Sequence, residues 1–287
     1  GELAGAGAVA VSDDGRPVTS SQMMRRVLEY SQVFNLIAIS HAEDLSLSAG
    51  GVMNEGSMST RLGLAGIPAE AEEIAIYRDI KLAALAKAPL HLAHVSTAGS
   101  VEIIRQAKAQ GLRITAETAP HYFSLTEEAV AGYRTEAKMN PPLRTQNDVD
   151  AIIQGLADGT LDAVATDHAP HSEIEKKLEF ERASFGIIGL ETALPLTLNL
   201  VRKGHLTLSR AIELLSTNPS KILGIPGGSL TPGQPADLTL IDLNASWVVK
   251  ASRFKSLSRN TPFEGQTMTG QAVLTMVNGR TVQTQLG

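Results

Sequence analysis

The chain has 287 residues, 43% of them hydrophobic and 19% charged, so it can fold around a sizeable core. Its formal net charge of −5, without a lysine or arginine block, argues against a nucleic-acid partner. No apolar run approaches the roughly 18 residues that a membrane span requires, so we expect no membrane partner. The chain has no cysteine, which fits a cytoplasmic protein and leaves histidines and carboxylates as the ligands for any metal.

Apolar runs that predict strands alternate with amphipathic stretches that predict helices. The predicted strands begin near Ala8, Leu36, Leu90, Leu112 and Leu161. The predicted helices cover residues 20–34, 68–86, 100–110, 148–156, 189–202 and 209–215, and a glycine-rich loop spans residues 51–66. This alternation predicts an α/β fold with a parallel sheet and right-handed crossovers.

A complete (β/α)8 barrel of the TIM type has eight strands and about 250 residues. Five predicted strands fill roughly the first 200 residues here, so we expect about the last five βα units of such a barrel. Gly1 is not an initiator Met and runs almost directly into an apolar strand, so we also expect the chain to begin inside a domain.

The sequence pattern changes after residue 226. Residues 235–243, 246–249 and 272–277 alternate or run apolar, and Asn278-Gly279 is a strong signal for a hairpin turn. We therefore predict two parts: a partial barrel over residues 1–226 and a β-rich C-terminal appendage over residues 227–287 that packs on it.

Polar side chains follow several of the predicted strands where each strand ends. These residues are Asp14, His41, His94 and Asp167. The carboxyl ends of the strands in such a barrel build one active face, so we expect the four side chains to converge there. Histidine and carboxylate groups together can hold a divalent metal of the zinc type.

Three other histidines are not predicted to be metal ligands. A single histidine at a strand end is more often a hydrogen-bonded structural residue than a ligand. His91 lies three residues before His94, so strand alternation predicts that His91 points to the outer, helix-facing side. We expect His121 and His205 to be structural or surface residues.

Several short motifs in the sequence together resemble those of a known family. The motifs, in chain order, resemble those of dihydroorotases in the amidohydrolase superfamily, most closely the bacterial type I group. They are Asp13-Asp14-Gly15, His41-Ala42-Glu43-Asp44, His94-Val95-Ser96-Thr97, Asn140-Pro141-Pro142-Leu143-Arg144 and Asp167-His168-Ala169-Pro170-His171. Residues 224–242 and Asn260-Thr261-Pro262-Phe263 resemble the C-terminal portion of that family.

The resemblance implies a metal-dependent hydrolase and a role for each matching residue. Asp14, His41, His94 and Asp167 match metal ligands, and Asp167 also matches the acid and base. Asn140, His171 and the backbone of Phe185 and Gly186 match substrate contacts. The implied cofactor is one or two Zn²⁺ ions, with other divalent metals as alternatives.

The implied reaction is the reversible conversion of N-carbamoyl-L-aspartate to L-dihydroorotate, a small-molecule step of pyrimidine biosynthesis. The implied assembly is a homo-oligomer. Hydantoinases and allantoinases, which also act on cyclic amides, use a carboxylated lysine at the place of Asp14. No lysine lies near Asp14 in the sequence, which favours dihydroorotase over these alternatives.

The sequence departs from the family pattern in one respect. The family's first metal motif, His-x-His, is absent, so the chain corresponds to a C-terminal portion without the first three βα units. A second hypothesis is therefore a non-catalytic, dihydroorotase-like subunit or scaffold that partners aspartate carbamoyltransferase. The intact ligand positions favour descent from an active enzyme.

Residues 172–184 carry many charges. We predict a solvated charged helix or loop there. The alternative is a mobile cover over the site, because such loops commonly exclude water from active sites.

Overall fold

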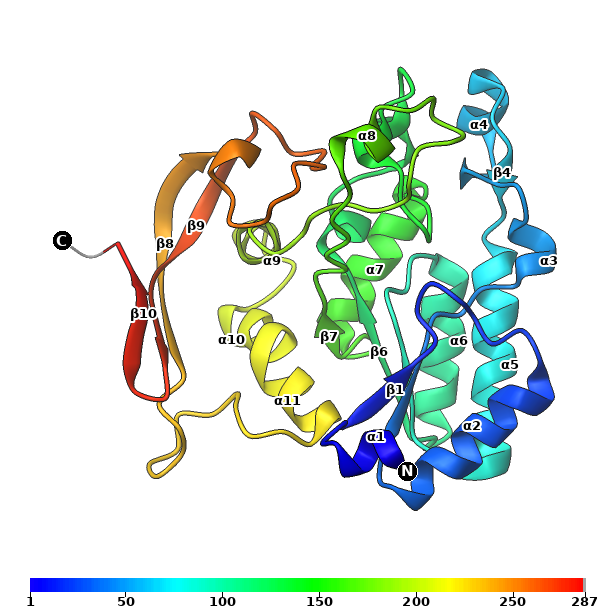
Figure 1. Ribbon diagram of the computed structural model, residues 1–287, viewed down its shortest axis with the longest axis horizontal. Coiled ribbons are helices and arrows are strands. Elements are labelled where there is room, and N and C mark those ends of the chain that lie inside the picture. The colour runs from blue at the N-terminus through cyan, green and yellow to red at the C-terminus, as the bar shows by residue number, and fades with distance from the viewer. Residues whose placement is uncertain (286–287) are drawn as a thin grey trace.

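The computed structural model describes residues 1–285 and contains a five-stranded parallel sheet at its centre (Figure 1). The strands lie in the order β1-β2-β5-β6-β7. Their bounds are β1 (Ala10–Ser12), β2 (Ile37–Ser40), β5 (Leu90–Leu92), β6 (Ile114–Thr118) and β7 (Ala163–Val164). All four neighbouring pairs are parallel, which confirms the predicted sheet.

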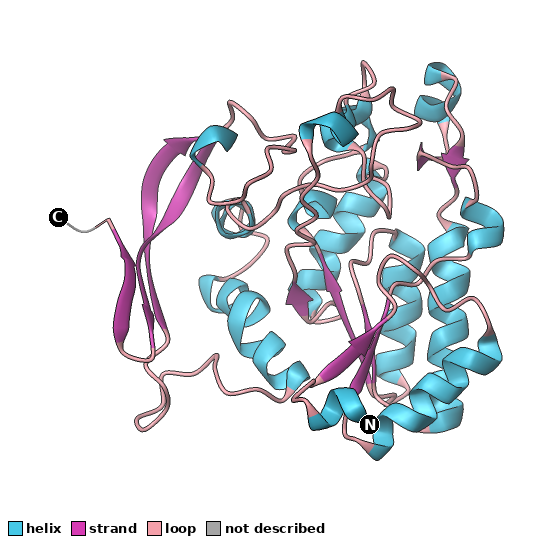
Figure 2. Cartoon of the chain, viewed as in Figure 1, coloured by secondary structure: helices cyan, strands magenta, loops and turns pink. Residues whose placement is uncertain are grey.

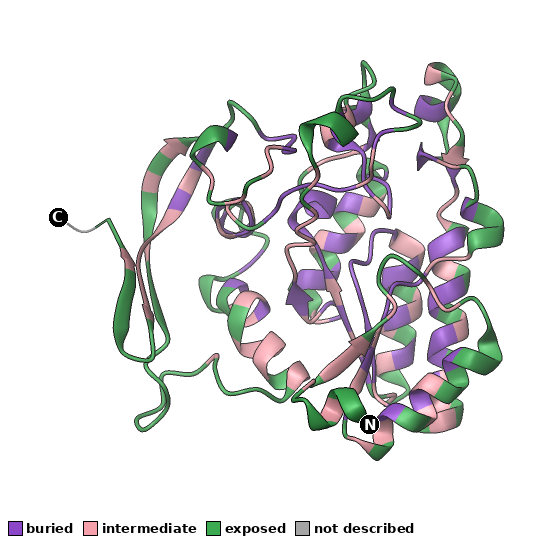
Figure 3. Cartoon of the chain, viewed as in Figure 1, coloured by how far each residue is buried: buried purple, intermediate pink, exposed green. Residues whose placement is uncertain are grey.

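Helices connect these strands and cover one face of the sheet (Figure 2). They are α2 (Ser21–Val33), α5 (Glu70–Ala86), α6 (Ala98–Ala109) and α7 (Gln146–Asp158). Alternate strand residues such as Leu90, Leu92 and Ala116 pack with Ile104 of α6 in the main core, which is continuous and buried. Figure 3 shows this burial on the sides of the helices that face the strands. The chain therefore has the architecture of part of a TIM-type barrel, as predicted.

The loops beyond the carboxyl ends of the strands contain further short elements. They are α3 (Leu45–Ser48), β3 (Met53–Asn54), α4 (Ser57–Leu62) and β4 (Gly66–Ile67), then η1 (Pro120–Phe123), η2 (Glu127–Val130), η3 (Thr135–Ala137) and α8 (Glu173–Lys176). β3 and β4 form a parallel pair of their own. A Cβ atom at Gly66 would lie 2.5 Å from the Cα of Glu55, so this close approach requires glycine.

The last part of the chain forms a second sheet. After α9 (Ala193–Arg202), α10 (Leu208–Ile212), η4 (Glu213–Thr217) and α11 (Asn218–Leu223) come β8 (Leu238–Val248), η5 (Ala251–Arg253), β9 (Thr267–Val277) and β10 (Arg280–Thr284). The antiparallel order is β10-β9-β8. Asn278 and Gly279 have φ values of 49° and 75°, so the predicted hairpin turn is confirmed.

This second sheet packs against α9. The guanidinium of Arg202 donates hydrogen bonds to the carbonyl oxygens of Leu243 at 2.9 Å and Thr269 at 2.8 Å. Val249, Phe263 and Met268 form a small buried cluster beside it. The division of the chain at residue 226 stays a prediction.

Two further predictions, the start of the first strand and the lack of a membrane span, can be compared with the structure. Residues 2–5 form a short helix, α1 (Glu2–Gly5), and the first strand begins at Ala10 rather than Ala8. Within residues 1–285, no helix has both the length and the apolar character needed to cross a membrane.

Core burial leads to the first testable prediction. Ile104 is fully buried, whereas Ile174 is 79% exposed. Ile104→Ala should lower the free energy of unfolding by about 2–5 kcal/mol, because it leaves a cavity in the core. Ile174→Ala is the control and should change it by less than about 0.5 kcal/mol. Denaturant unfolding of both variants measures the difference, and equal effects would contradict the described packing.

Candidate metal centre

The parallel register of β1, β2 and β5 determines which side chains meet at the sheet edge. Ser12 is opposite Ile39, and Ser40 is opposite Leu92, so the three strands end side by side. Asp14 follows β1, His41 follows β2 directly, and His94 follows β5. These three side chains, up to 80 positions apart along the chain, therefore lie together at this edge of the sheet.

Asp14, His41 and His94 form a cluster whose possible ligand atoms all lie within 4.8 Å of one another. Asp14 Oδ1 is 3.2 Å from His41 Nδ1 and 3.7 Å from His94 Nε2. The two imidazole nitrogens are 2.8 Å apart, a hydrogen-bonding distance. Three of the four predicted metal ligands thus lie together, and the fourth, Asp167, is outside this cluster.

Backbone hydrogen bonds to the partly buried Asp13 and the buried Glu72 hold the loops that carry the cluster. Asp13 accepts from the backbone N–H of His41 at 2.8 Å and from that of Val18 at 2.7 Å. Glu72 of α5 accepts from the backbone N–H of Ser96 at 3.0 Å, just beyond His94. His94 has a φ of 36°, a left-handed conformation that is unfavourable for most residues and that its surroundings must hold.

Glu43 joins the cluster to the loop that contains Asn140. Its Oε2 atom lies 3.1 Å from His41 Nε2 and accepts from Asn140 Nδ2, also at 3.1 Å. A carboxylate on the second nitrogen of a metal-binding histidine fixes the orientation and tautomer of the ring. Glu43 was not among the predicted site residues, although it lies only two residues after His41.

The close contacts shift the pKa values of the cluster. Burial alone would lower the pKa of His41, but hydrogen bonds from its ring to Asp14 and Glu43 raise it to about 9. The hydrogen bond from His41 and the nearby ring of His94 hold the pKa of Asp14 well below its usual range. The metal-free site therefore combines a carboxylate with a protonated imidazole at neutral pH.

Asp167 lies beyond β7 in a buried setting and in a left-handed conformation, with a φ of 46°. Its Oδ2 atom is 3.7 Å from His121 Nε2, and among the described residues neither atom has a hydrogen-bond partner. Burial raises the pKa of Asp167 and lowers that of His121 to about 3. His121 was expected to be structural or at the surface; the structure buries it beside Asp167.

The prediction for His91 was wrong. Leu90 and Leu92 face the helices in the main core, so His91 points to the opposite face of the sheet. There it contacts Thr115 Oγ1 at 2.8 Å and Glu117 Oε2 at 3.1 Å on β6. Strand alternation does not extend from His91 to His94, because β5 ends at Leu92 and His94 is left-handed.

The predicted substrate contacts occupy two neighbouring loops. Asn140 reaches the metal cluster through Glu43. Gly186 lies against His171, because a Cβ atom at Gly186 would be 3.0 Å from the His171 ring. The Asn260 side chain links this pair, donating to the Gly186 carbonyl at 3.0 Å and accepting from the His171 N–H at 3.4 Å.

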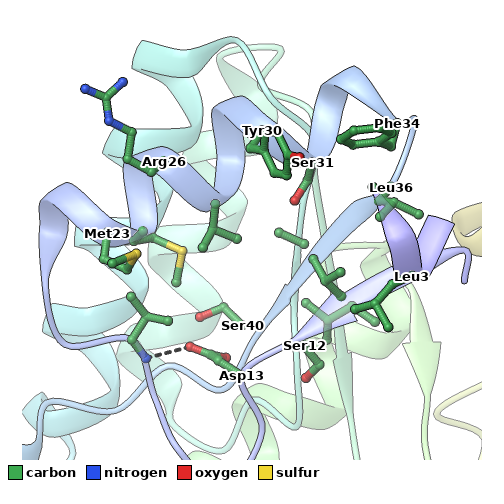
Figure 4. A pocket seen from close by; sticks show the side chains of 17 residues that line it. Leu3, Ser12, Asp13, Met23, Arg26, Tyr30, Ser31, Phe34, Leu36 and Ser40 are labelled. Carbon is green, nitrogen blue, oxygen red and sulfur yellow. Dashed lines mark hydrogen bonds between the residues drawn. The ribbon is translucent and has the colours of Figure 1, made fainter. Parts of the chain in front are cut away.

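A separate cavity of about 460 Å³ lies between α2 and the strands β1 and β2 (Figure 4). Its walls are mainly apolar and include Met23, Tyr30 and Leu36. None of the clustered residues Asp14, His41 and His94 lines it. The cavity therefore does not contain the candidate metal centre.

Comparison with known proteins agrees with this architecture. The sequence profile of the amidohydrolase family matches residues 1–282. The chain belongs to the amidohydrolase family. Among solved amidohydrolase-like structures, the L-hydantoinase (dihydropyrimidinase) from Arthrobacter aurescens superposes with a TM-score of 0.89 at 30% sequence identity, over 100% of this chain and 67% of that chain.

Curated relatives of this amidohydrolase are more similar in sequence. A protein of Pelobacter propionicus named dihydroorotase is 59% identical over 282 residues, which are 98% of this chain and 66% of the relative. A dihydroorotase of Acetivibrio thermocellus is 56% identical over 283 residues, with the same coverage of 98% and 66%. The chain thus spans 66% of the length of these relatives.

The close contacts of the His41 ring with Asp14 and Glu43 give a prediction about the pH at which this ring titrates. In metal-free protein, the His41 ring should titrate near pH 9, and Asp14→Asn should lower that pKa. Because the folded-state pKa is raised, the stabilisation from His41 is present below about pH 6.5 and is lost as the pH rises through 9. Histidine NMR titration measures both values.

Asp150→Asn is the matched control, because Asp150 is an exposed carboxylate on α7. It should leave the His41 titration unchanged. A His41 ring that titrates below pH 7 in the parent protein would contradict the described contacts.

Proposed function

We propose that the protein catalyses the reversible conversion of N-carbamoyl-L-aspartate to L-dihydroorotate. The observation that carries this proposal is the cluster of Asp14, His41 and His94 beside the buried carboxylate of Asp167. Relatives named dihydroorotase, 56% and 59% identical to this chain, support the choice of substrate.

The donor set fits a divalent metal of the zinc type. Two imidazoles and a carboxylate converge, and His94 Nδ1 and Asp167 Oδ2 are buried without hydrogen-bond partners among residues 1–285. Asp14, His41 and His94 would hold the ion, with Asp167 as a further ligand, and one or two Zn²⁺ ions are proposed. Such an ion lowers the pKa of water to about 7 and polarises a carbonyl group.

Asp167 is the proposed acid and base. In the hydrolytic direction, water attacks the ring amide carbon, and Asp167 accepts its proton as the new C–O bond forms. The ring C–N bond then breaks, and Asp167 returns the proton to the leaving nitrogen. Ring closure is the reverse. Burial raises the pKa of Asp167, which suits a group that must be both protonated and ionised in one cycle.

Asn140, His171 and the backbone of Phe185 and Gly186 are the proposed substrate contacts. The substrate carries carboxylate and amide groups, which accept and donate hydrogen bonds to such side chains and backbone groups. Glu43 orients the Asn140 amide, and Asn260 holds Gly186 beside His171. These contacts select a small polar molecule.

Hydantoin hydrolysis is the alternative within the family, since the L-hydantoinase of Arthrobacter aurescens has a similar structure. The first lysine of the chain is Lys81, far in sequence from the carboxylate of Asp14. In the cluster, Asp14 stands where a hydantoinase would have a carboxylated lysine, which supports the dihydroorotase proposal.

A scaffold that binds aspartate carbamoyltransferase is the alternative from another class of function. Three intact candidate ligands support the enzyme instead. A homo-oligomer is proposed for the assembly, and size-exclusion chromatography with and without aspartate carbamoyltransferase tests both the oligomer and the partner.

The decisive experiment assays protein expressed from its complete gene. Purified, zinc-loaded protein should interconvert N-carbamoyl-L-aspartate and L-dihydroorotate, and chelation should abolish the turnover. Hydantoin and dihydrouracil are the comparison substrates. Faster turnover of either would favour the hydantoinase alternative, and binding of zinc without any turnover would favour the scaffold.

The role of Asp167 gives a further prediction. Asp167→Asn keeps the size of the side chain but removes its ability to accept a proton, so kcat should fall by about 100-fold or more. Substrate affinity, measured by calorimetry, should stay close to that of the parent. Asp150→Asn, at an exposed carboxylate on α7, is the control. Parent-like turnover of Asp167→Asn would exclude this role.

A further inference from the structure

Two buried lysines hold the segment that follows His171, and they differ from the exposed charged residues of that segment. We call residues 172–186 the lysine-anchored loop. Glu173 and Lys177 are exposed and pair with each other. Lys176, by contrast, is only 5% exposed, and Lys138, which packs against the loop, is 1% exposed. The sequence predicted a solvated charged segment here, which holds for part of it.

Lys138 binds the loop through backbone carbonyl groups. Its ammonium donates to the carbonyl oxygens of Phe180 at 2.7 Å, Glu181 at 3.0 Å and Ala183 at 2.7 Å. An ammonium group has three N–H donors, so all of them are used. The ring of Phe185 also lies 4.4 Å from this nitrogen, within the range of a cation–π contact.

Lys176 fixes the end of the same loop. Its ammonium donates to the carbonyl oxygens of Ser184 at 2.8 Å and Gly186 at 3.1 Å. Residues 177–186 contain no helix or strand, so these carbonyl groups lack the partners that regular structure would supply. The two ammonium groups supply those partners, because a buried carbonyl without a hydrogen bond costs free energy.

The anchored carbonyl groups lie beside the proposed substrate contacts. Gly186 donates its N–H to the carbonyl of Lys138 at 2.8 Å, so Lys138 holds the loop through both its side chain and its backbone. Lys138 is also two residues from Asn140. Gly186 is thus hydrogen-bonded to Lys138 and Lys176, and Asn260 links it to His171. Phe185 joins this unit through its ring contact with the Lys138 ammonium.

We propose that Lys138 and Lys176 are positioning residues that hold the lysine-anchored loop closed and thereby preset Phe185, Gly186 and His171 for substrate. The proposal rests on the proposed function. Neither lysine touches the metal cluster, so the loss of either should weaken substrate binding and leave metal binding intact. Loss of a preset geometry reduces kcat/KM by as much as about 100-fold in other enzymes.

The test uses Lys138→Met and Lys176→Met, which keep the apolar stem and remove the ammonium. Lys177→Met is the matched control, because Lys177 is exposed and adjacent in sequence. Hydrogen exchange of zinc-loaded, substrate-free protein should become roughly tenfold faster in residues 178–186, without a change in α5 or α6. KM should rise roughly tenfold with zinc content unchanged, and kcat should fall less.

Each of the other possible results of this test contradicts one part of the proposal. Unchanged exchange in the loop overturns the anchoring, and faster exchange with an unchanged KM overturns the positioning role. If a methionine variant fails to fold, Lys138→Gln and Lys176→Gln keep a donor and should show smaller effects of the same kind. A parent protein without turnover of L-dihydroorotate overturns the proposed function, whereas the exchange data still decide the anchoring.

Discussion

The parallel register of β1, β2 and β5 is the constraint on which the candidate site depends. Ala38 of β2 and Leu90 and Leu92 of β5 are buried against the helices, and Val11 of β1 packs partly buried against the same core. A shift of one residue would turn these apolar side chains to the other face of the sheet, so the register is strongly fixed. The same register brings the strand ends together, and Asp14, His41 and His94 meet only because it does.

Buried or partly buried charged side chains hold the loops above this edge. Glu72 binds the backbone after His94, and Asp13 binds the backbone of His41. Arg144 donates to Asn54 Oδ1 at 2.8 Å and to the carbonyl of Ile67 at 2.7 Å, and Lys138 binds the lysine-anchored loop. These side chains satisfy backbone groups where the chain has little regular structure. The result is a set of irregular loops with defined positions, which a substrate site needs.

Local pattern was sufficient for the regular elements. The apolar runs predicted the five strands of the parallel sheet, and Asn278-Gly279 predicted the hairpin, because period and turn chemistry are local properties. Polar residues at strand ends predicted the meeting of Asp14, His41 and His94. The burial of His121 beside Asp167 and of Lys176 in its loop was not predicted, since a histidine or lysine has the same appearance in sequence whether it is buried or exposed. His91 was placed on the wrong face because the left-handed turn at His94 leaves no clear mark in the sequence.

By itself, the sequence determined the order of strands and helices, the edge at which polar groups gather and the type of ligand available there. The tertiary structure decided which of those groups touch: Glu43 with His41 and Asn140, His121 with Asp167, and two lysines with the carbonyl groups of one loop. The reason is physical. Secondary structure follows from neighbouring residues, whereas burial and pKa depend on what the folded chain brings together from distant positions.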